Sequence, residues 1–434
     1  MPVNPSHPSP PRPVLQNIAL GVVLGAFVAS TAWAGGFSLP NQGAKAMGMA
    51  GAFVAQADDA TAIFYNPAGI ALQDEKKGAL GISVDVLNES LYQGFPSGIG
   101  SGTTGEQDVG TAFPPHVYAI MKLGANTKFG IGLTTPFHLD TAWANPDTFA
   151  GRGITTAAEL QTWDATAVFS MKCGEALGLA AGVIYRTSEL SHGRRLIGTN
   201  PFTNEDIDIA SINLESDSSD GLGYTAGVLV RPNDRFSLGL SYRSAIDITY
   251  TGVGTLSQIA SGSDQLDSFF RAIYSFDEQI PAGTSIEMPE EATVGVALGI
   301  TPALMVEVDV TYTGWSSFET LNLAFPTDSS LNIAIPQMFD DSVSVRAGLQ
   351  YTTATGTQFR VGAAYDESPQ GDSTVGPLLV DANRTIFAAG FSKDWLDLAV
   401  QWVDREQRII DDQVDTLNGN YRSSAYALAF TLGM

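Results

Sequence analysis

The chain ends with residues 426–434, YALAFTLGM, in which large apolar residues alternate with small or polar ones. At the edge of a soluble sheet, such an apolar strand would expose unpaired N–H and C=O groups and invite aggregation. In a closed transmembrane barrel the same strand pairs on both sides, with its large face in lipid and its small face toward the lumen. The terminal stretch therefore predicts a strand of a membrane-spanning β-barrel.

Residues 1–34 have the features of a secretory signal peptide. An apolar stretch near residues 18–28 precedes Ala32-Trp33-Ala34, a small-residue cleavage site that would leave Gly35 as the first mature residue. The alternative, a helix that stays attached to a membrane, is disfavoured because the stretch is short and contains two glycines. No later segment has the ~18 consecutive apolar residues of a spanning helix, so the exported chain is periplasmic, secreted or an outer-membrane barrel.

The composition favours the barrel. Only 16% of the residues are charged and 45 are glycine, as many short strands and tight turns require. The balance of 22 Lys and Arg against 46 Asp and Glu gives a net charge of −24, which argues against a nucleic-acid partner because phosphates would be repelled. The acidic residues of the outer loops either keep those loops solvated or bind divalent cations among lipopolysaccharide. Cys173 is the single cysteine, so no intramolecular disulfide is possible, and we expect it at a strand end.

Segments of about ten residues with period-two alternation recur from residue 78 onward, separated by turn residues. We predict fourteen antiparallel strands, an even number, as closure of a barrel from one chain usually requires. They are expected at 78–87, 114–123, 128–136, 163–173, 176–187, 221–231, 235–245, 291–300, 303–313, 341–352, 357–365, 384–393, 395–405 and 421–434.

Two kinds of connector alternate between these strands. Short turns, such as 174–175 and 301–302, alternate with long connectors, of which 188–220 and 246–290 are the longest. Short periplasmic turns opposite long external loops are typical of outer-membrane barrels. The fold class that we predict is therefore all-β, a 14-stranded antiparallel transmembrane barrel.

Residues 35–77 do not follow the strand rhythm. They are rich in Gly and Ala, with Met47, Met49 and Phe53 near helical spacing. They form either a periplasmic tail or a plug, and the plug is favoured because fourteen strands enclose an interior too wide for side chains alone to fill. The predicted domains are thus a removed signal peptide (1–34), an N-terminal hatch (35–77) and the barrel (78–434).

Several motifs in these segments resemble those of the FadL family of outer-membrane transporters for hydrophobic compounds. In the hatch they are QGAKAMGMAGA (42–52), ADDA (57–60) and FYNPAG (64–69), and further along the chain PF (136–137), SYRS (241–244), WSSF (315–318) and AYDESP (364–369). The resemblance covers essentially all of the mature chain. Two features depart from the family pattern: His138 stands where relatives often carry Gly, and Met434 stands where barrels of this class usually end in Phe.

The resemblance implies a 14-stranded barrel plugged by an N-terminal hatch, in agreement with the strand count. It implies capture of the substrate between two long external loops, transfer to a pocket beside the hatch, and release through a sideways gap at a kink in the third strand. The expected substrates are long-chain fatty acids, or alternatively aromatic hydrocarbons, moved by passive diffusion without a cofactor or metal. The other expected partners are outer-membrane lipid, lipopolysaccharide and the barrel assembly machinery, with the chain as a monomer.

The candidate gating residues lie in the hatch. Asn66-Pro67-Ala68 combines a residue biased toward an extended or turn conformation with a proline that lacks an N–H donor. From the residues alone a plain turn is the simpler reading; with the resemblance, a gating role is favoured, with Asn66 as a hydrogen-bonding anchor. Asp58 and Asp59 form either a solvated turn or a buried contact, and if buried they need a basic or N–H partner.

The candidate ligand contacts lie in the wall and the external loops. Pro136, at the end of the third strand, either ends that strand or helps to open the wall. In the fourth loop, apolar residues at helical spacing either pack as a core or form a ligand groove, and loop arginines either meet nearby acids or pair with a fatty-acid carboxylate. These residues are Leu266, Phe269, Phe270, Ile273, Phe276, Arg271, Arg194 and Arg195.

Three other functions are weaker. An outer-membrane hydrolase would need a catalytic constellation, and His116, His138 and His192 of the mature chain stand in none. A general porin would have an open, charge-lined lumen rather than an apolar plug. An adhesive or structural barrel would not affect uptake of hydrophobic nutrients. We therefore expect a transporter and not an enzyme.

Overall fold

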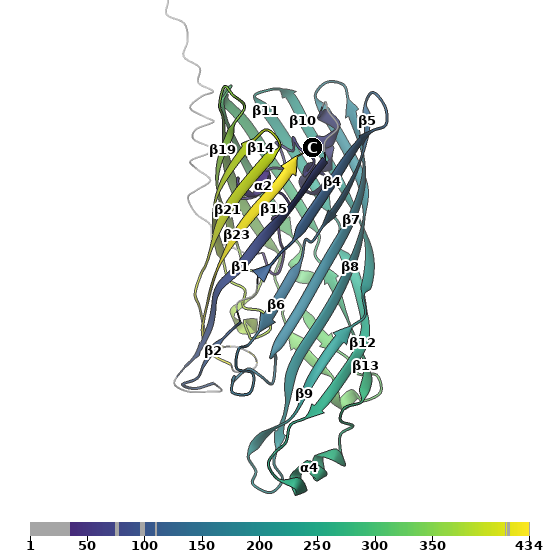
Figure 1. The fold of residues 1–434 in the computed structure, drawn as a ribbon, viewed down its shortest axis with the longest axis vertical. Coiled ribbons are helices and arrows are strands. Elements are labelled where there is room, and N and C mark those ends of the chain that lie inside the picture. Colours follow the sequence, from purple (N-terminus) through teal and green to yellow (C-terminus); the bar gives the residue numbers. More distant parts are fainter. Residues whose placement is uncertain are drawn as a thin grey trace, which may run out of the picture. The chain divides into compact units, whose positions relative to one another are not determined.

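A computed structural model describes residues 35–73, 78–95, 100–108, 111–412, 414 and 417–433, and these residues form one barrel with a segment inside it (Figure 1). The predicted signal peptide and Met434 lie outside the described residues. Among the described residues, no helix has the length and apolar character needed to cross a bilayer.

The barrel wall consists of the fourteen strands expected from the sequence, and the fold prediction is confirmed. In chain order they are β1 (Gly78–Gly94), β4 (Pro115–Lys122), β5 (Thr127–Thr134), β7 (Ala157–Cys173), β8 (Leu177–Thr199), β10 (Ser219–Asn233), β11 (Phe236–Arg243), β14 (Glu291–Thr301), β15 (Leu304–Thr313), β18 (Ser342–Thr352), β19 (Gln358–Asp366), β20 (Arg384–Lys393), β21 (Leu396–Arg405) and β23 (Gly419–Gly433). The single cysteine, Cys173, lies at the end of β7.

Each wall strand pairs antiparallel with its neighbours, and the first strand closes the barrel against the last. The β1–β23 ladder runs from the Ala79↔Gly433 pair to the Gly94↔Gly419 pair, with an irregularity between Leu87 and Glu89. Closure leaves no free edge along this seam, which is how a β-structure satisfies its backbone groups in lipid. The bare terminal strand of the sequence is therefore paired on both sides, by β1 and β21.

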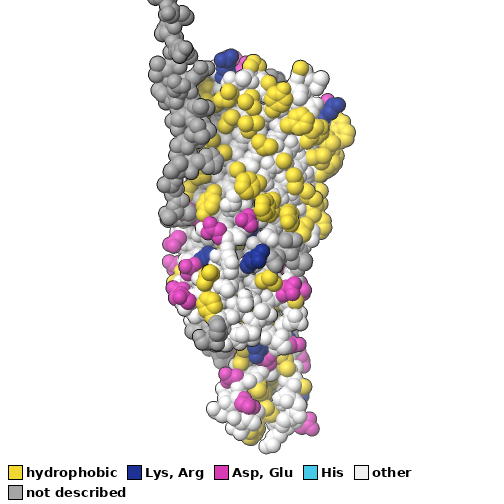
Figure 2. Space-filling view, turned by 90° about the vertical axis from the view of Figure 1, so that its left-hand side faces the viewer, with side chains coloured by type: hydrophobic (Ala, Val, Ile, Leu, Met, Phe, Trp, Pro, Cys, Tyr) yellow, Lys and Arg dark blue, Asp and Glu magenta, His cyan; other side chains and the backbone are white. Residues whose placement is uncertain are grey.

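Side chains alternate between lipid and lumen along the wall. On β23, Leu428 and Phe430 are 52% and 40% exposed, whereas Ala427 and Ala429 are 3% and 5% exposed. Apolar side chains cover the upper part of the face shown in Figure 2, and most of its acidic side chains lie lower down. The apolar band belongs to the end of the barrel with the short turns.

The outer parts of the molecule contain more strand than the sequence suggested. The two longest connectors are not loops but continue the sheet, because β8 extends to Thr199 and pairs with β9, which pairs in turn with β12. The prediction stopped where the in–out alternation stops, although the backbone hydrogen bonding continues. The additional elements are β2 (Thr104–Glu106), β3 (Thr111–Ala112), β6 (His138–Ala142), β9 (Asp206–Ser216), β12 (Ile246–Gln258), α4 (Asp264–Arg271), β13 (Gln279–Met288), η2 (Trp315–Ser317), β16 (Thr320–Leu323), η3 (Ser329–Leu331), β17 (Ile333–Pro336), η4 (Asp372–Thr374) and β22 (Arg408–Ile410).

The segment inside the barrel contains three short helices, α2 (Ala44–Met47), α3 (Ala62–Tyr65) and η1 (Pro67–Leu72). Its backbone approaches the wall closely where the wall carries glycine. A Cβ atom on Gly48 of the hatch would lie 2.8 Å from the Cα atom of Gly390 in β20. Small residues on both sides therefore let α2 lie directly against the wall.

Candidate functional site

Two carboxylates of β15 hold the hatch by its backbone. Asp309 Oδ2 accepts hydrogen bonds from the N–H groups of Phe53 and Val54, at 2.7 and 2.9 Å. Glu307 Oε1 accepts one from Ala55 at 2.6 Å, and both of its oxygens lie about one hydrogen-bond length, 3.1 and 3.0 Å, from the N–H of Gln56. Both carboxylates are almost completely buried. Four consecutive backbone donors therefore fix one turn of the hatch to one strand.

Asn66 joins the hatch to β10, which β11 and β14 separate from β15 in the wall. Its backbone is extended, with φ −156° and ψ 100°, and its side chain caps η1 by accepting from Ala68 N at 3.1 Å. The amide nitrogen donates to Val54 O at 2.9 Å and to Val228 O of β10 at 3.1 Å. Since a Cβ atom on Gly227 would meet Asn66 Oδ1 at 2.4 Å, the wall is shaped to admit this side chain. The gating role of 66–68 stays a prediction.

Asp58 and Asp59 lie at the same end of the hatch but differ in their partners. Lys45 Nζ lies 2.6 Å from Asp58 Oδ1. Burial opposes the charged form, but the Lys45 ammonium, the Gln56 amide and the Arg231 guanidinium together lower the pKa of Asp58. Asp59 accepts hydrogen bonds from the backbone and hydroxyl of Thr61, and burial raises its pKa. The Lys45–Asp58 pair thus links two parts of the hatch.

The third wall strand is interrupted at Pro136. β5 ends at Thr134 and β6 begins at His138, yet both pair with the continuous strand β7. β4 pairs with β5 only from Val117 to Lys122, and among the described residues no strand pairs with the other edge of β6 between His138 and Thr141. The wall therefore has an incomplete ladder beside Pro136, between β6 and the outer half of β1.

The first residues of the hatch cover this break from inside. We call residues 35–41 the arm. Leu39 N donates to Pro136 O at 2.7 Å, and His138 N donates to Phe37 O at 3.1 Å. The Phe37 ring packs edge-on against Trp315, with ring centroids 4.8 Å apart, and is 6% exposed. The arm thus takes the place of a strand neighbour at the interruption.

A series of adjacent pockets lies between the outer loops and this break. The first, the loop pocket, lies between the outer hairpins and has about 300 Å³ of space, open solvent included; Leu190, His192, Leu214, Tyr250 and Leu323 line it. The second, the central pocket, is narrow and has about 410 Å³ of space, open solvent included. It shares Leu190 and His192 with the loop pocket, and no Asp, Glu, Lys or Arg lines it.

The third, the side pocket, shares Phe37, Leu139 and Leu379 with the central pocket. It has about 870 Å³ of space, open solvent included, and lies at the wall break between Val86 of β1 and β6. Each pocket therefore shares lining residues with the next, from the outer hairpins to the incomplete ladder. Phe37 of the arm lies at the last junction.

His192, which lines the first two pockets, is uncharged at neutral pH. It lies on the outer part of β8, where this strand pairs with β7 on one side and with β9, instead of β10, on the other. Burial and the nearby Arg194 guanidinium lower its pKa to about 4. Its Nε2 atom lies 3.0 Å from Thr155 Oγ1. The route through the loop and central pockets is therefore mostly apolar.

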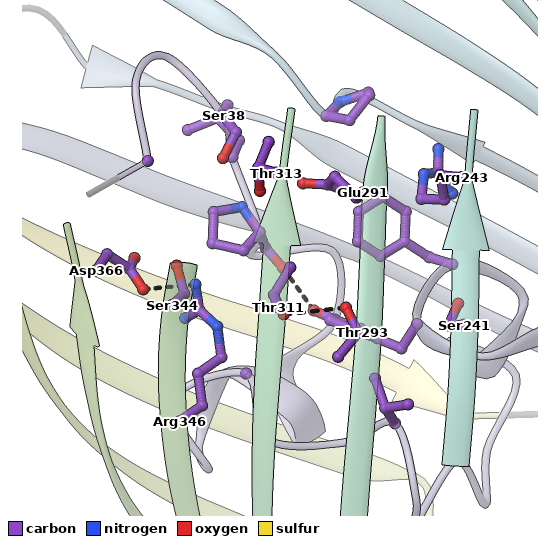
Figure 3. A pocket seen from close by; sticks show the side chains of 18 of the residues that line it. Ser38, Ser241, Arg243, Glu291, Thr293, Thr311, Thr313, Ser344, Arg346 and Asp366 are labelled. Carbon is purple, nitrogen blue, oxygen red and sulfur yellow. Dashed lines mark hydrogen bonds and ion pairs between the residues drawn. The ribbon is translucent and has the colours of Figure 1, made fainter. Parts of the chain in front are cut away.

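A fourth, polar pocket lies between the hatch and the wall strands β11, β14, β15, β18 and β19 (Figure 3). Arg346 is paired with Asp366 at 2.8 Å, and Thr293 and Thr311 hydroxyls lie 3.0 Å apart. Arg243 is paired with Asp164 at 2.9 Å and lies over the Phe64 ring of the hatch. An apolar molecule would meet paired charges and hydroxyls here, unlike in the central pocket.

The loop residues predicted as ligand contacts divide into a packed and an exposed set. Leu266 and Phe270 of α4 are buried against Ile209 and Ala210 of β9, whereas Phe269 is 40% exposed and Ile273 56% exposed. α4 ends at Arg271, so the expectation that Ile273 and Phe276 continue the helix is wrong. The chain turns there instead, with a further hydrogen bond from Tyr274 N to Phe270 O.

The loop arginines also differ from one another. Arg271 is exposed and has no ion pair among the described residues. Arg195 is paired with Asp147, and burial lowers the pKa of Arg194. None of the predicted loop residues lines one of the four pockets. Sequence reasoning missed Phe37 and the side pocket; an aromatic residue directly after the predicted cleavage site was the one available signal.

Comparisons with known proteins bear on the family and the fold. The family model described as "Outer membrane protein transport protein (OMPP1/FadL/TodX)" matches residues 25–434. The chain is 24% identical over 429 residues to the long-chain fatty acid transport protein of Salmonella typhi, covering 92% of this chain and 91% of that one. It is 23% identical over 439 residues to the protein of the same name from Escherichia coli K12, with the same coverage.

Solved structures show the same fold at low sequence identity. A Pseudomonas aeruginosa FadL homologue superposes with a TM-score of 0.77 at 20% identity, covering 92% of this chain and 99% of that one. The Ralstonia pickettii toluene transporter TbuX superposes with a TM-score of 0.63 at 16% identity, covering 91% and 99%. At these identities the likeness concerns the fold alone.

Proposed function

Because the chain belongs to the OMPP1/FadL/TodX family of outer-membrane transport proteins, we propose that it takes up long-chain fatty acids by passive diffusion and releases them sideways through its wall. The observation that carries this proposal is the series of pockets from the outer hairpins to the break at Pro136. The protein is a transporter of the outer membrane, in a family of transporters rather than enzymes. Its relatives named above supply the substrate class.

The driving force in this proposal is burial of apolar surface. Each CH₂ group removed from water contributes about 0.8 kcal/mol, so an alkyl chain gains free energy on entering the mostly apolar loop and central pockets. The exposed Phe269 and Ile273 of the outer hairpin make the first contact. Release goes to outer-membrane lipid, and no cofactor takes part.

The strength of the anchors favours movement of the arm over movement of the whole hatch. The arm is held by the two backbone bonds with Pro136 and His138 and by Gly36 N donating to Asp381 Oδ2 at 3.2 Å. Its last residue, Asn41, adds two bonds to β1: its backbone O accepts from Ser83 Oγ at 2.8 Å, and its Nδ2 donates to Asp85 Oδ1 at 3.4 Å. Net contributions near 1 kcal/mol per bond give on the order of 5 kcal/mol for these five bonds. The rest of the hatch is bonded to β4, β10, β11, β15, β18, β21 and β23.

Aromatic hydrocarbons are the second candidate substrate. The absence of charged residues from the lining of the central pocket suits a neutral compound as well as an alkyl tail. One of the structural neighbours is a toluene transporter. In this second case the arm and the side pocket would have the same role.

The test is to tie the arm to the wall. Ser38 and Phe137 are bridge partners whose flanking bonds make them a non-hydrogen-bonded antiparallel pair, with a Cα separation near 4.5 Å that suits a disulfide. In a Cys173→Ser background, oxidised Ser38→Cys/Phe137→Cys should take up labelled oleate at the rate of cells lacking the protein. Reduction should restore uptake at least several-fold.

The control disulfide is Thr293→Cys/Thr311→Cys, which joins β14 to β15 and leaves the arm free. It should transport equally well oxidised and reduced. Uptake by the oxidised arm variant at the reduced rate would refute gating by the arm. Equal oleate uptake with and without the protein would refute the transport proposal itself.

A further inference from the structure

The ladder between β1 and β23 closes the barrel, and no turn connects these two strands. The other wall ladders join wall strands that follow one another along the chain, and in such pairs the connecting turn helps to fix the register. The lipid-facing side chains do not select a register at the seam. Leu80 and Ile82 of β1 and Leu428 and Phe430 of β23 are all large, apolar and exposed, so a shift by two residues would exchange one such side chain for another.

One row of the lumen face differs from its neighbours at this seam. Gly81 of β1 pairs with His116 of β4 on one side and with Thr431 of β23 on the other, so three residues form a row across three adjacent strands (Figure 1). A Cβ atom on residue 81 would collide with His116 Nε2. Because glycine has no Cβ atom, the His116 ring reaches across β1, and its Nε2 atom lies 2.8 Å from Thr431 Oγ1. We call Gly81, His116 and Thr431 the seam row.

The seam row distinguishes the observed register from its neighbours. Two residues to either side of Thr431 lie Ala429 and Gly433, neither of which has a polar side chain. A shift of β23 by two residues would place one of them opposite Gly81. Among the described residues, the Nδ1 atom of His116 has no hydrogen-bond partner, so Thr431 is the single partner of this buried ring. Losing it would leave a buried polar ring without any hydrogen bond, which is costly.

The hatch binds to the same place. Ala44 N, at the start of α2, donates to Thr431 Oγ1 at 2.9 Å, and Tyr118 Oη of β4 donates to Gln42 O at 2.8 Å. The hatch is therefore bonded to strands on both sides of β1. A shift of β23 by two residues would move Thr431 by about 7 Å relative to Tyr118, and the two bonds could then not form together.

We propose that the seam row sets the register in which the barrel closes, and that the hatch docks fully only in a barrel closed in that register. Closure and plugging are linked through one hydroxyl, because Thr431 Oγ1 is bonded both to His116 and to Ala44. A barrel closed two residues out of register would keep its apolar lipid face but lose this anchor of the hatch, and it would leak ions. The proposal concerns assembly and does not depend on the substrate.

Disulfides between β1 and β23 can detect the register. Ser83 N donates to Pro114 O, on the β4 side of β1. Asp85, two residues further on, therefore forms a non-hydrogen-bonded pair with Ala427 of β23, with a Cα separation near 4.5 Å that suits a disulfide.

Three pairs of cysteines are compared in a Cys173→Ser background. All three contain Asp85→Cys, and the second cysteine replaces one of three alanines on the lumen side of β23. Ala427→Cys detects the observed register, whereas Ala425→Cys and Ala429→Cys detect the two shifted ones. In the observed register the Cα atoms of the last two pairs lie about 7–8 Å apart, too far for a disulfide. Crosslinking is measured in the assembled protein by its mobility on non-reducing gels.

The variant Thr431→Val removes the hydroxyl and keeps the shape of the side chain. It should raise crosslinking of the shifted pairs at least several-fold at the expense of the Ala427→Cys pair. Thr431→Ser keeps the hydroxyl and should crosslink as the wild type does, as should Thr166→Val, at a buried threonine of β7 outside the seam. Ala44→Pro removes only the hatch donor, at a first helical position that accepts proline. It should keep the wild-type crosslinks.

In planar bilayers Thr431→Val should show more channel openings than Thr431→Ser. Crosslinking of Thr431→Val through the Ala427→Cys pair alone would overturn the assignment of the register to the seam row. Shifted crosslinks in Ala44→Pro would overturn it as well, because the hatch would then set the register. Shifted crosslinks in Thr431→Val without added openings would refute the link between closure and plugging.

Folding of the position-431 variants gives a further criterion. If Thr431→Val formed no folded barrel and Thr431→Ser did, the hydroxyl would be required for closure, in support of the proposal. Failure of both variants to fold would count against it, because residue 431 would then tolerate no change of shape, with or without a hydroxyl.

Discussion

Glu367 is a buried carboxylate directly after β19, and its Oε1 atom has no hydrogen-bond partner among the described residues. Burial, helped by the charge of Glu406, raises the pKa of Glu367 to about 7. An acid whose pKa is higher in the folded than in the unfolded state stabilises the fold below the unfolded pKa, near 4.5, and this stabilisation is lost as the pH rises to 7.

We expect Glu367→Gln to remove part of the pH dependence of stability. Between pH 4.5 and 8 the free energy of unfolding of the wild type should fall relative to the variant, on the order of 1–2 kcal/mol after allowance for solvent screening. The melting temperature in neutral detergent, measured by circular dichroism at several pH values, reports this difference. Glu278→Gln, at an exposed position of the outer hairpin, is the control; identical pH profiles for all three proteins would contradict the prediction.

At the residue scale the sequence located groups but not their partners. Asp58 and Asp59 were identifiable as a buried contact or a turn, and Lys45, the partner of Asp58, lies only 13 positions away. Asp309 binds backbone groups 256 and 255 positions away, so no local spacing signals its role.

At the scale of elements, the wall strands were predictable because lipid on one side and the lumen on the other impose strict alternation. The errors in the predicted elements occur where this alternation is no longer imposed. Beyond Ser188, β8 exchanges its neighbour β10 for β9 while it stays paired with β7 as far as Gly193, and this outer part no longer shows the alternation of a strand between lipid and lumen. The pairing of the arm with the wall was not predicted, because it consists of only two backbone hydrogen bonds, with Pro136 and His138, and such a short pairing leaves no alternation in the sequence.

α4 shows how one short helix can combine a structural face and an exposed face. Leu266 and Phe270 pack on β9, whereas Phe269 and Ile273 are exposed. We expect Phe269→Ser/Ile273→Ser to leave stability within about 0.5 kcal/mol of the wild type, as surface substitutions usually do. Because these side chains make the first contact with the substrate in the proposed function, oleate uptake should fall several-fold at low oleate concentration and recover at high oleate concentration.

Phe270→Ser is the matched control on the buried face. Removing this ring and burying a hydroxyl should cost about 3–5 kcal/mol locally, which limited proteolysis of the outer hairpins would detect. Equal uptake by the wild type and the exposed-face double variant, at every oleate concentration, would show that these side chains do not take part in capture.

At the scale of the whole molecule, the hatch decides whether the barrel is a transporter or an open pore. Fourteen strands enclose an interior that must be filled by something other than wall side chains. The filling is attached at several points around the wall, through Glu307 and Asp309 on one side and Asn66 on another. A plug bonded in this way should let an apolar substrate pass at the arm without opening a continuous water path.

The double variant Glu307→Ala/Asp309→Ala should therefore raise the ion conductance while the strands of the barrel stay paired. It leaves the N–H groups of residues 53–56 without acceptors, at a cost of about 1–3 kcal/mol for each group that stays buried, so the hatch should detach intermittently. In planar bilayers the wild type should show no steady open-channel current, and the double alanine variant should show frequent openings. Glu307→Gln/Asp309→Asn keeps an acceptor oxygen at each position and should open less often. A large steady current through the wild type would contradict the plugged barrel. If the double alanine variant showed no channel openings, these carboxylates would not be what holds the hatch in place, because releasing the hatch should open a water path through an interior as wide as that of fourteen strands.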